Sequence, residues 1–142
     1  MDKNQQEIMY QLAMLEQQIQ HLQQQLQAVE ESNLDLNTLL LALDDLKGSV
    51  GKEVMAPLGR GIFVKTKLLS EDLVVDIGGR NLVGKSITDT KKIISEQIEK
   101  LNQIKKELIE RIEESGKELT RIISKEESGE ESIDEDEEEK ED

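Results

Sequence analysis

The sequence predicts an α+β protein in which two long helices form an antiparallel coiled-coil hairpin with two β-hairpins at its base. Two long segments repeat apolar residues at spacings of three and four, and only two of the 142 residues are aromatic. The stretch between these segments holds seven of the nine glycines and the only proline. Heptad spacing is typical of helices that bury a narrow seam, and glycine-rich, β-branched stretches are typical of strands and turns. We therefore expect an elongated molecule without a compact core.

The first helix is expected over residues 5–47. Its apolar residues from Ile8 to Val29 keep the heptad pattern without a miss, and Asn33 interrupts it at an a position. Many glutamines on the other faces favour helix without adding charge.

The second helix is expected over residues 88–125, with its start near Ser86 or Thr88. Its seam is imperfect, because Lys105 falls at an a position and Ser115, next to Gly116, falls at a d position. Packing should therefore loosen along the outer half of this helix.

Residues 48–87 are expected to form two β-hairpins, with strands at 53–58, 62–69, 73–77 and 82–87. Pro57 has no N–H, which places the first strand at an edge or beside a bulge. Four strands in fewer than 40 residues bury too little surface to be stable alone, so another chain should pair with them. The apolar positions expected to carry this subunit assembly are Ile62, Phe63, Val64, Leu68, Val74, Val75 and Ile77.

The charge is concentrated at the end of the chain. Residues 126–142 contain 12 acidic groups and one lysine, which accounts for −11 of the net charge of −14 and leaves the body nearly balanced. We expect this segment to be a disordered acidic tail. The acidity gives no reason to expect nucleic acid, and no apolar run approaches the length of a membrane span. Without cysteine or a recognisable leader, a cytoplasmic protein is expected.

The order of the parts resembles the alpha-class subunit of prefoldin over residues 5–125. The most specific matches are APLGRGIFVKTKL, with the turn residues Pro57, Gly59 and Gly61, and VVDIGGR at the second hairpin. Beta-class subunits have a single hairpin between their helices, so the two-hairpin insert favours the alpha class.

The resemblance implies a chaperone of the holdase type. Two alpha and four beta subunits would form a hetero-hexamer in which the hairpins assemble into an intersubunit β-barrel. The coiled coils would hold unfolded client proteins at their tips and deliver them to a group II chaperonin without ATP. A homo-oligomeric prefoldin-like protein, or a coiled-coil scaffold or adaptor, is the alternative.

One motif favours a different class of protein. Residues Gly79 to Ser86, GRNLVGKS, match the P-loop pattern G-x-x-x-x-G-K-[ST], in which Lys85 and Ser86 would hold phosphate and Mg²⁺. However, no strand follows that could supply a second metal-binding carboxylate or complete a parallel sheet. We regard the match as a coincidence and expect no enzyme, no catalytic or metal-binding residues and no cofactor.

Client binding is expected at the end of the helix pair that carries the two termini. If Leu46 lies opposite Ser86 at the base, Ile8 lies opposite Ser124 at that end. More apolar side chains gather there than a two-helix seam needs, and methionines suit promiscuous binding. The expected client-binding residues are Ile8, Met9, Tyr10, Leu12, Met14, Leu15, Leu119, Ile122 and Ile123.

Overall fold

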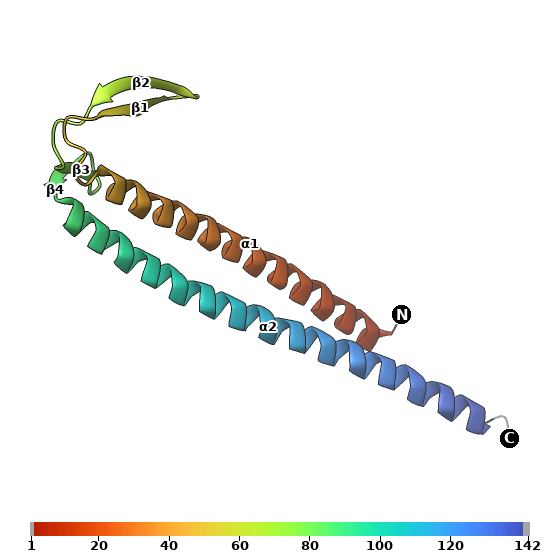
Figure 1. Cartoon of the computed structure of the whole chain (residues 1–142). Coiled ribbons are helices and arrows are strands. Elements are labelled where there is room, and N and C mark those ends of the chain that lie inside the picture. The colour runs from red at the N-terminus through yellow and green to blue at the C-terminus, as the bar shows by residue number, and fades with distance from the viewer. Residues whose placement is uncertain (1, 141–142) are drawn as a thin grey trace. The chain divides into compact units, whose positions relative to one another are not determined.

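The computed structural model describes residues 2–140, with side chains described through residue 127. Helix α1 spans Lys3–Leu46 and helix α2 spans Ile87–Lys140. Between them lie four strands: β1 Glu53–Gly59, β2 Ile62–Lys67, β3 Leu73–Asp76 and β4 Leu82–Lys85 (Figure 1). The predicted class, two long helices with two small antiparallel β-hairpins, is confirmed.

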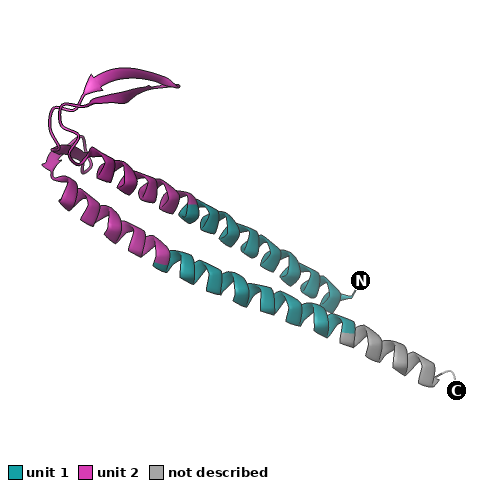
Figure 2. Ribbon diagram, in the orientation of Figure 1, with its two compact units in different colours: residues 1–30, 103–142 teal, residues 31–102 magenta. Residues whose placement is uncertain are grey.

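The chain divides into two compact units, and each contains part of both helices (Figure 2). Unit 1 comprises residues 1–30 and 103–142, and unit 2 comprises residues 31–102. The core of unit 2 is a cluster of Leu43, Ile87 and Ile94, each at most 5% exposed. In the part of unit 1 whose side chains are described, the buried apolar residues are Leu22 and Leu108. Both units are thus organised around a narrow helix–helix seam.

Each helix begins at a side-chain cap. The Asp2 carboxylate accepts a hydrogen bond from the Gln5 N–H at 2.9 Å, and the Ser86 hydroxyl accepts one from the Asp89 N–H at 3.1 Å. These bonds satisfy N–H groups that the first helical turn leaves unpaired. Because Ser86 is the cap, Ile87 is the first residue of α2 and enters the core of unit 2. The prediction that the last strand runs through Ile87 was therefore wrong by two residues.

Polar pairs fix the alignment of α1 and α2 within each unit. In unit 2, Asn33 Nδ2 donates to Asn102 Oδ1 at 3.1 Å, and Asp44 forms an ion pair with Lys91. In unit 1, Glu30 Oε1 lies 3.7 Å from Lys105 Nζ. In all three pairs, the α1 residue lies opposite an α2 residue about three positions later in the sequence than the predicted opposition of Leu46 and Ser86 requires. The difference arises because the packing of the apolar cluster sets the alignment, and residue spacing alone does not specify that packing.

The β1–β2 hairpin contains the bulge that Pro57 indicated. Its antiparallel register places Ala56 opposite Val64 and Pro57 opposite Phe63, after which Gly59 pairs with Ile62 and the register shifts. The extra residue is Leu58, which is 71% exposed. An additional residue on one strand bends the ladder and increases its twist. The prediction that Pro57 lies at an edge or beside a bulge is confirmed.

The β3–β4 hairpin is a separate two-stranded sheet, with Val75 opposite Val83. Leu73, at the start of β3, packs against the core of unit 2. The tip of each hairpin holds an arginine in the left-handed region, Arg60 with φ 51° and Arg80 with φ 64°. Such angles favour glycine or asparagine, so both turns keep a long basic side chain at a position that does not favour it.

Helix α2 continues through Lys140, whereas the heptad spacing predicts helix only to residue 125. No proline interrupts the segment, and glutamate is a good helix former, so the backbone has no strong stop signal there. The side chains beyond residue 127 lie outside the described part of the chain. The solvating role of the acidic segment 126–142 therefore stays a prediction.

Candidate functional site

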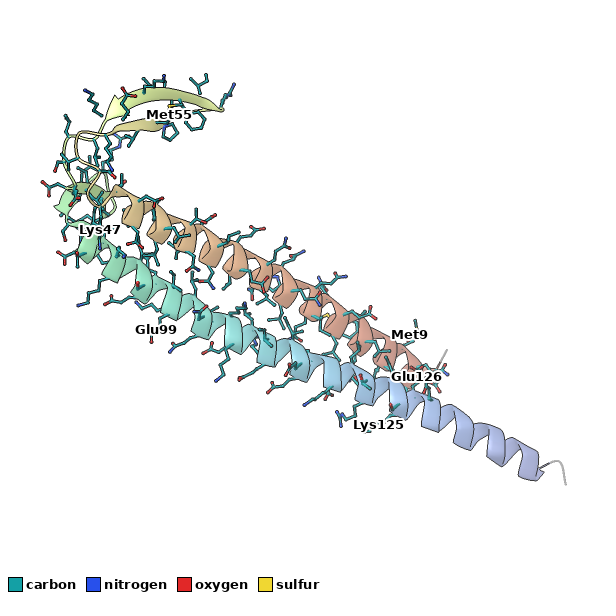
Figure 3. All side chains as sticks on the ribbon, viewed as in Figure 1. Met9, Lys47, Met55, Glu99, Lys125 and Glu126 are labelled. Carbon is teal, nitrogen blue, oxygen red and sulfur yellow. The ribbon has the colours of Figure 1, made fainter. Side chains whose placement is uncertain are left out.

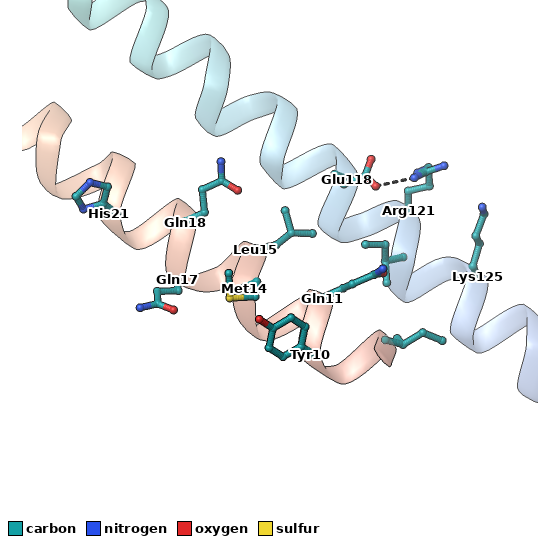
Figure 4. Close-up of a pocket in the computed structure, with 12 residues that line it drawn as sticks. Tyr10, Gln11, Met14, Leu15, Gln17, Gln18, His21, Glu118, Arg121 and Lys125 are labelled. Atoms are coloured by element: carbon teal, nitrogen blue, oxygen red, sulfur yellow. Dashed lines mark hydrogen bonds and ion pairs between the residues drawn. The ribbon is translucent and has the colours of Figure 1, made fainter. Parts of the chain in front are cut away.

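Unit 1 contains an open groove of about 870 Å³ between the first part of α1 and the segment 118–125 of α2 (Figure 4). Its apolar lining comes from both helices, with Ile8 and Leu15 on α1 and Ile122 on α2. Tyr10 and Met14 also line it and are 67% and 50% exposed. Apolar surface is therefore available to a ligand in this part of the molecule. We call this feature the terminal groove.

The remaining lining of the terminal groove is polar and mostly uncharged on the α1 side. Gln11, Gln17, Gln18 and His21 lie on that side, and His21 is hydrogen-bonded to Gln25 at 3.2 Å. These groups present amide donors and acceptors next to the apolar lining.

On the α2 side the lining is charged. Arg121 donates to Glu118 Oε1 at 2.6 Å, and this hydrogen bond raises the pKa of the Arg121 guanidinium. Arg121 is a cation, as arginine always is in proteins, and Glu118 places an opposite charge beside it. Lys125 completes this side of the groove.

Five of the nine residues predicted to bind clients line the terminal groove: Ile8, Tyr10, Met14, Leu15 and Ile122. Met9 and Ile123 do not line it, although they are 51% and 41% exposed, and Leu12 and Leu119 are half-buried in the seam. Client binding by any of these residues stays a prediction.

The polar part of the lining was not among the predicted residues. A signal was present, because Gln11, Gln18 and Leu15 are spaced by three and four and so share one helix face. The residue that faces Gln18 across the groove depends on the alignment of the helices, which the sequence alone does not provide.

The two hairpins of unit 2 carry a second set of exposed apolar side chains, among them Met55 (Figure 3). Of the residues predicted to carry assembly, Leu68 and Val75 are half-buried and the others are exposed. Met55, Leu58, Leu69 and Leu82 add to this surface and were not predicted. Side chains of this kind are usually covered by another chain.

The P-loop match does not have the geometry of a phosphate site. Residues Leu82–Lys85 form β4, and Lys85 lies opposite Leu73 in the ladder with β3. A P-loop wraps its N–H groups around phosphate oxygens, which an extended strand cannot do. The Ser86 hydroxyl, which would hold Mg²⁺, instead caps α2. The structure thus favours the interpretation of the motif as a coincidence.

The described residues include no cluster of three or more acidic, histidine or cysteine side chains suited to holding a metal ion. A search for membrane spans in the same part of the chain found no helix with the length and apolar character to cross a bilayer.

Comparison with known proteins decides the family. Residues 15–129 match the family model described as "Prefoldin subunit". The chain belongs to the prefoldin family. Because the match reaches from α1 through both hairpins into α2, it includes most of the terminal groove and the whole β region.

Similar curated proteins place the chain in the alpha class of prefoldin. It is 32% identical over 80 residues to prefoldin subunit alpha of Methanosphaera stadtmanae, a match covering 56% of this chain and 58% of that protein. It is 30% identical over 104 residues to prefoldin subunit alpha of Methanococcus aeolicus, covering 72% and 71% respectively. The chain thus spans little more than half the length of the first of these relatives.

A solved prefoldin has the same fold. The filamentous prefoldin from Methanocaldococcus jannaschii, determined by cryo-electron microscopy, aligns with a TM-score of 0.71 at 23% identity. The alignment covers 81% of this chain and 97% of that chain.

Proposed function

We propose that this prefoldin chain is a molecular chaperone subunit of the holdase type, which binds unfolded proteins in the terminal groove without ATP. The observation that carries the proposal is the apolar lining from two helices, with Tyr10 and Met14 half or more exposed. Unfolded polypeptides expose apolar side chains that a folded protein buries, and an open groove of this kind can shield them from one another. Methionine adapts its shape to varied partners, which suits a site without sequence preference.

The glutamines of the groove have a matching role. An unfolded client presents unpaired peptide N–H and C=O groups as well as apolar side chains. Gln11, Gln17 and Gln18 each offer an amide that both donates and accepts hydrogen bonds. Contacts to the peptide backbone are independent of the client's sequence, so the groove would recognise the unfolded state rather than a motif.

A single groove of this size would bind weakly, so the proposal includes assembly. Several grooves on one complex raise the overall affinity without any new contact, provided that one client reaches more than one of them. The exposed hairpin residues of unit 2 supply a surface for this assembly. We propose that two such chains join four beta-class subunits through an intersubunit β-barrel in the cytoplasm. The complex would deliver its clients to a group II chaperonin.

The test compares exposed apolar residues in the two units. Replacing Tyr10 by Ser and Met14 by Gln should reduce suppression of client aggregation several-fold, because the groove loses its most accessible apolar surface. The matched control is Leu34→Gln with Leu41→Gln, because both leucines are 67% exposed on α1 in unit 2. Light scattering of a denatured model client, with native mass to verify assembly, gives the readout. Equal loss of protection in both variants would show that general surface hydrophobicity, rather than the groove, holds clients.

A nucleotide requirement is tested separately. Lys85→Ala should leave client protection intact, and ATP with Mg²⁺ should not shift the melting temperature, because a ligand selective for the folded state must stabilise it. ATP turnover that disappears with this substitution would assign the chain to the nucleotide-binding enzymes instead.

The alternative function is a homo-oligomeric prefoldin or a coiled-coil scaffold. The fold shared with a filamentous prefoldin favours keeping this candidate. Native mass of the chain alone and after co-expression with a beta-class subunit separates the two. A large homo-oligomer that ignores the beta-class subunit would support the alternative.

A further inference from the structure

Methionine sulfur is the most readily oxidised side-chain group of this chain. The sequence contains no cysteine and no tryptophan, so a peroxide finds neither a thiol nor an indole to react with. Three of the four methionines lie in the described part of the chain, and each is half or more exposed: Met9 at 51%, Met14 at 50% and Met55 at 62%. Because their exposure is similar, we expect these three sulfurs to react with peroxide at similar rates.

The surroundings of these methionines differ. Met14 lines the terminal groove of unit 1, whereas Met55 lies in β1 of unit 2. Tyr10 precedes Met14 by four residues on α1, and Gln17 and Gln18 follow it by three and four. Side chains at these spacings are neighbours on a helix surface, and all of them line the groove (Figure 4). The Met14 thioether is thus flanked by an aromatic ring on one side and by two amides on the other.

We propose that Met14 is a site of reversible oxidation by peroxide, and that its sulfoxide lowers the affinity of the terminal groove for unfolded proteins. This role rests on the proposed function and adds a modification that regulates it. Hydrogen peroxide transfers an oxygen atom to the thioether sulfur, so that an S–O bond forms, the O–O bond breaks and water leaves. The sulfur is oxidised and the peroxide is reduced. Methionine sulfoxide reductases, supplied with a thiol reductant, reverse the step.

The added oxygen changes the polarity of the groove rather than its size. The groove is open and has a volume of about 870 Å³, so a single oxygen atom does not block it. The sulfoxide oxygen is a hydrogen-bond acceptor where the thioether offered apolar surface. An apolar client side chain that covers this oxygen displaces water from it, and the desolvation of an unpaired acceptor opposes binding.

The neighbouring glutamines add to this effect. Gln17 and Gln18 lie about one helical turn from Met14, and their amide N–H groups are suitable donors to a sulfoxide oxygen. An amide that donates to the oxidised side chain is no longer available to the peptide groups of a client. Oxidation of Met14 therefore removes both an apolar contact and an amide donor that the proposed function assigns to the groove.

The modification should leave the helix pair intact. Met14 is half exposed, in contrast to Leu22 and Leu108, which are almost fully buried in the seam of unit 1. In the free chaperone the sulfoxide oxygen therefore reaches water, and oxidation creates neither a cavity nor a buried unpaired group. We expect oxidation of Met14 to weaken client binding without lowering the melting temperature.

The test measures client protection before and after peroxide treatment. Full-length wild type, Met14→Leu and Met55→Leu are brought to the same assembly state, verified by native mass, and treated with hydrogen peroxide. Catalase then removes the peroxide, so that the client itself is not oxidised. Leucine has nearly the volume of methionine but no oxidisable sulfur. Peptide mass spectrometry measures the oxygen added at each methionine, and light scattering of a denatured model client measures protection.

Each protein is compared with its own untreated state, so differences in starting activity do not enter the comparison. We expect peroxide to reduce protection several-fold in the wild type and in Met55→Leu, and far less in Met14→Leu. Reductase treatment should restore protection by the oxidised wild type. Met55→Leu is the matched control, because Met55 is exposed to a similar degree but lies outside the groove.

Three results would overturn the role of Met14 while leaving the holdase proposal in place. The first is an equal loss of protection in Met14→Leu and the wild type, which would place the sensitive group elsewhere. The second is full protection by a wild type whose Met14 carries the oxygen. The third is a lower melting temperature of the oxidised wild type that Met14→Leu does not share, which would mean unfolding. An untreated wild type that fails to suppress aggregation would contradict the proposed function and, with it, the role of Met14.

Discussion

The same heptad pattern has different outcomes in the two units. In unit 2, Leu43, Ile87 and Ile94 are almost fully buried, and further apolar residues pack around them. In unit 1, Ile8, Leu15 and Ile122 line an open groove, and Tyr10 and Met14 beside them remain half or more exposed. Periodicity therefore identifies which residues share a helix face, but it does not determine whether that face is closed.

The chemistry of the flanking residues accounts for the difference. In unit 2, the chain reverses through the β region, Leu73 closes over the apolar cluster, and the Asp44–Lys91 ion pair flanks it. In unit 1, Ser115 and Gly116 occupy half-buried positions of α2 that larger side chains could fill. Small residues leave contacts unmade in a seam, which lowers packing density there. Unit 2 is built for stability, whereas unit 1 keeps apolar surface accessible.

The largest effect is expected from removing matched leucines at d positions of the two units. Leu43→Ala should lower the free energy of unfolding by about 2–4 kcal/mol, because a buried leucine leaves a cavity. Leu15→Ala should cost less than half as much, because its side chain already lies beside open space. Urea unfolding followed by circular dichroism measures both. Equal costs would mean that the groove of unit 1 is closed in solution, and the comparison would then fail.

Removal of the helix caps is expected to have a smaller effect. Ser86→Ala should cost about 1 kcal/mol in global stability, because Ile87, the next residue, is part of the core of unit 2. Asp2→Ala removes an equivalent bond in unit 1, but it should only accelerate amide exchange over the first turns of α1. Hydrogen exchange with mass-spectrometric detection distinguishes local from global opening. A global loss of protection in Asp2→Ala would show that the start of α1 is as tightly coupled to the rest as the start of α2.

These comparisons show what the sequence could and could not reveal. The heptad spacing and the glycine content located both helices and all four strands to within two residues at most ends, and Pro57 indicated the bulge. Helix α2 runs past residue 125, where the heptad spacing ends, because acidic residues that suggest disorder also permit helix. The alignment of the helices was wrong by about three residues, since it depends on how the side chains of unit 2 pack. For that reason, the polar lining of the terminal groove could not be assigned.

The smallest effect is expected from the Asp44–Lys91 ion pair of unit 2. The hydrogen bond that Lys91 donates to the Asp44 carboxylate holds the pKa of that carboxyl below its ordinary value. A lowered pKa in the folded state means that the pair stabilises unit 2 above about pH 4 and loses this contribution as the pH falls through the lowered value. Asp44→Asn should therefore make the fall in the free energy of unfolding at acid pH slightly less steep. Added salt should reduce the difference between this variant and the wild type.

The control for this ion pair is Asp45→Asn. The Asp45 carboxylate forms no ion pair with any described residue, so its replacement should leave the acid limb unchanged. Thermal unfolding between pH 2 and 7 gives the comparison. Identical profiles for the two variants would show that Lys91 is not the relevant partner.

The contact between Asn33 and Asn102 has a consequence for how such a chain can change length. A slip of one heptad would place Asn33 against Ser95 or Ile109, so the amide pair marks one alignment of the two helices. The parts of α1 and α2 between this amide pair and the β region are tied to the hairpins. Beyond the amide pair, whole heptads could be gained or lost from α1 and α2 together without altering the two hairpins. The length of the two helices can therefore change in evolution while the β region stays the same.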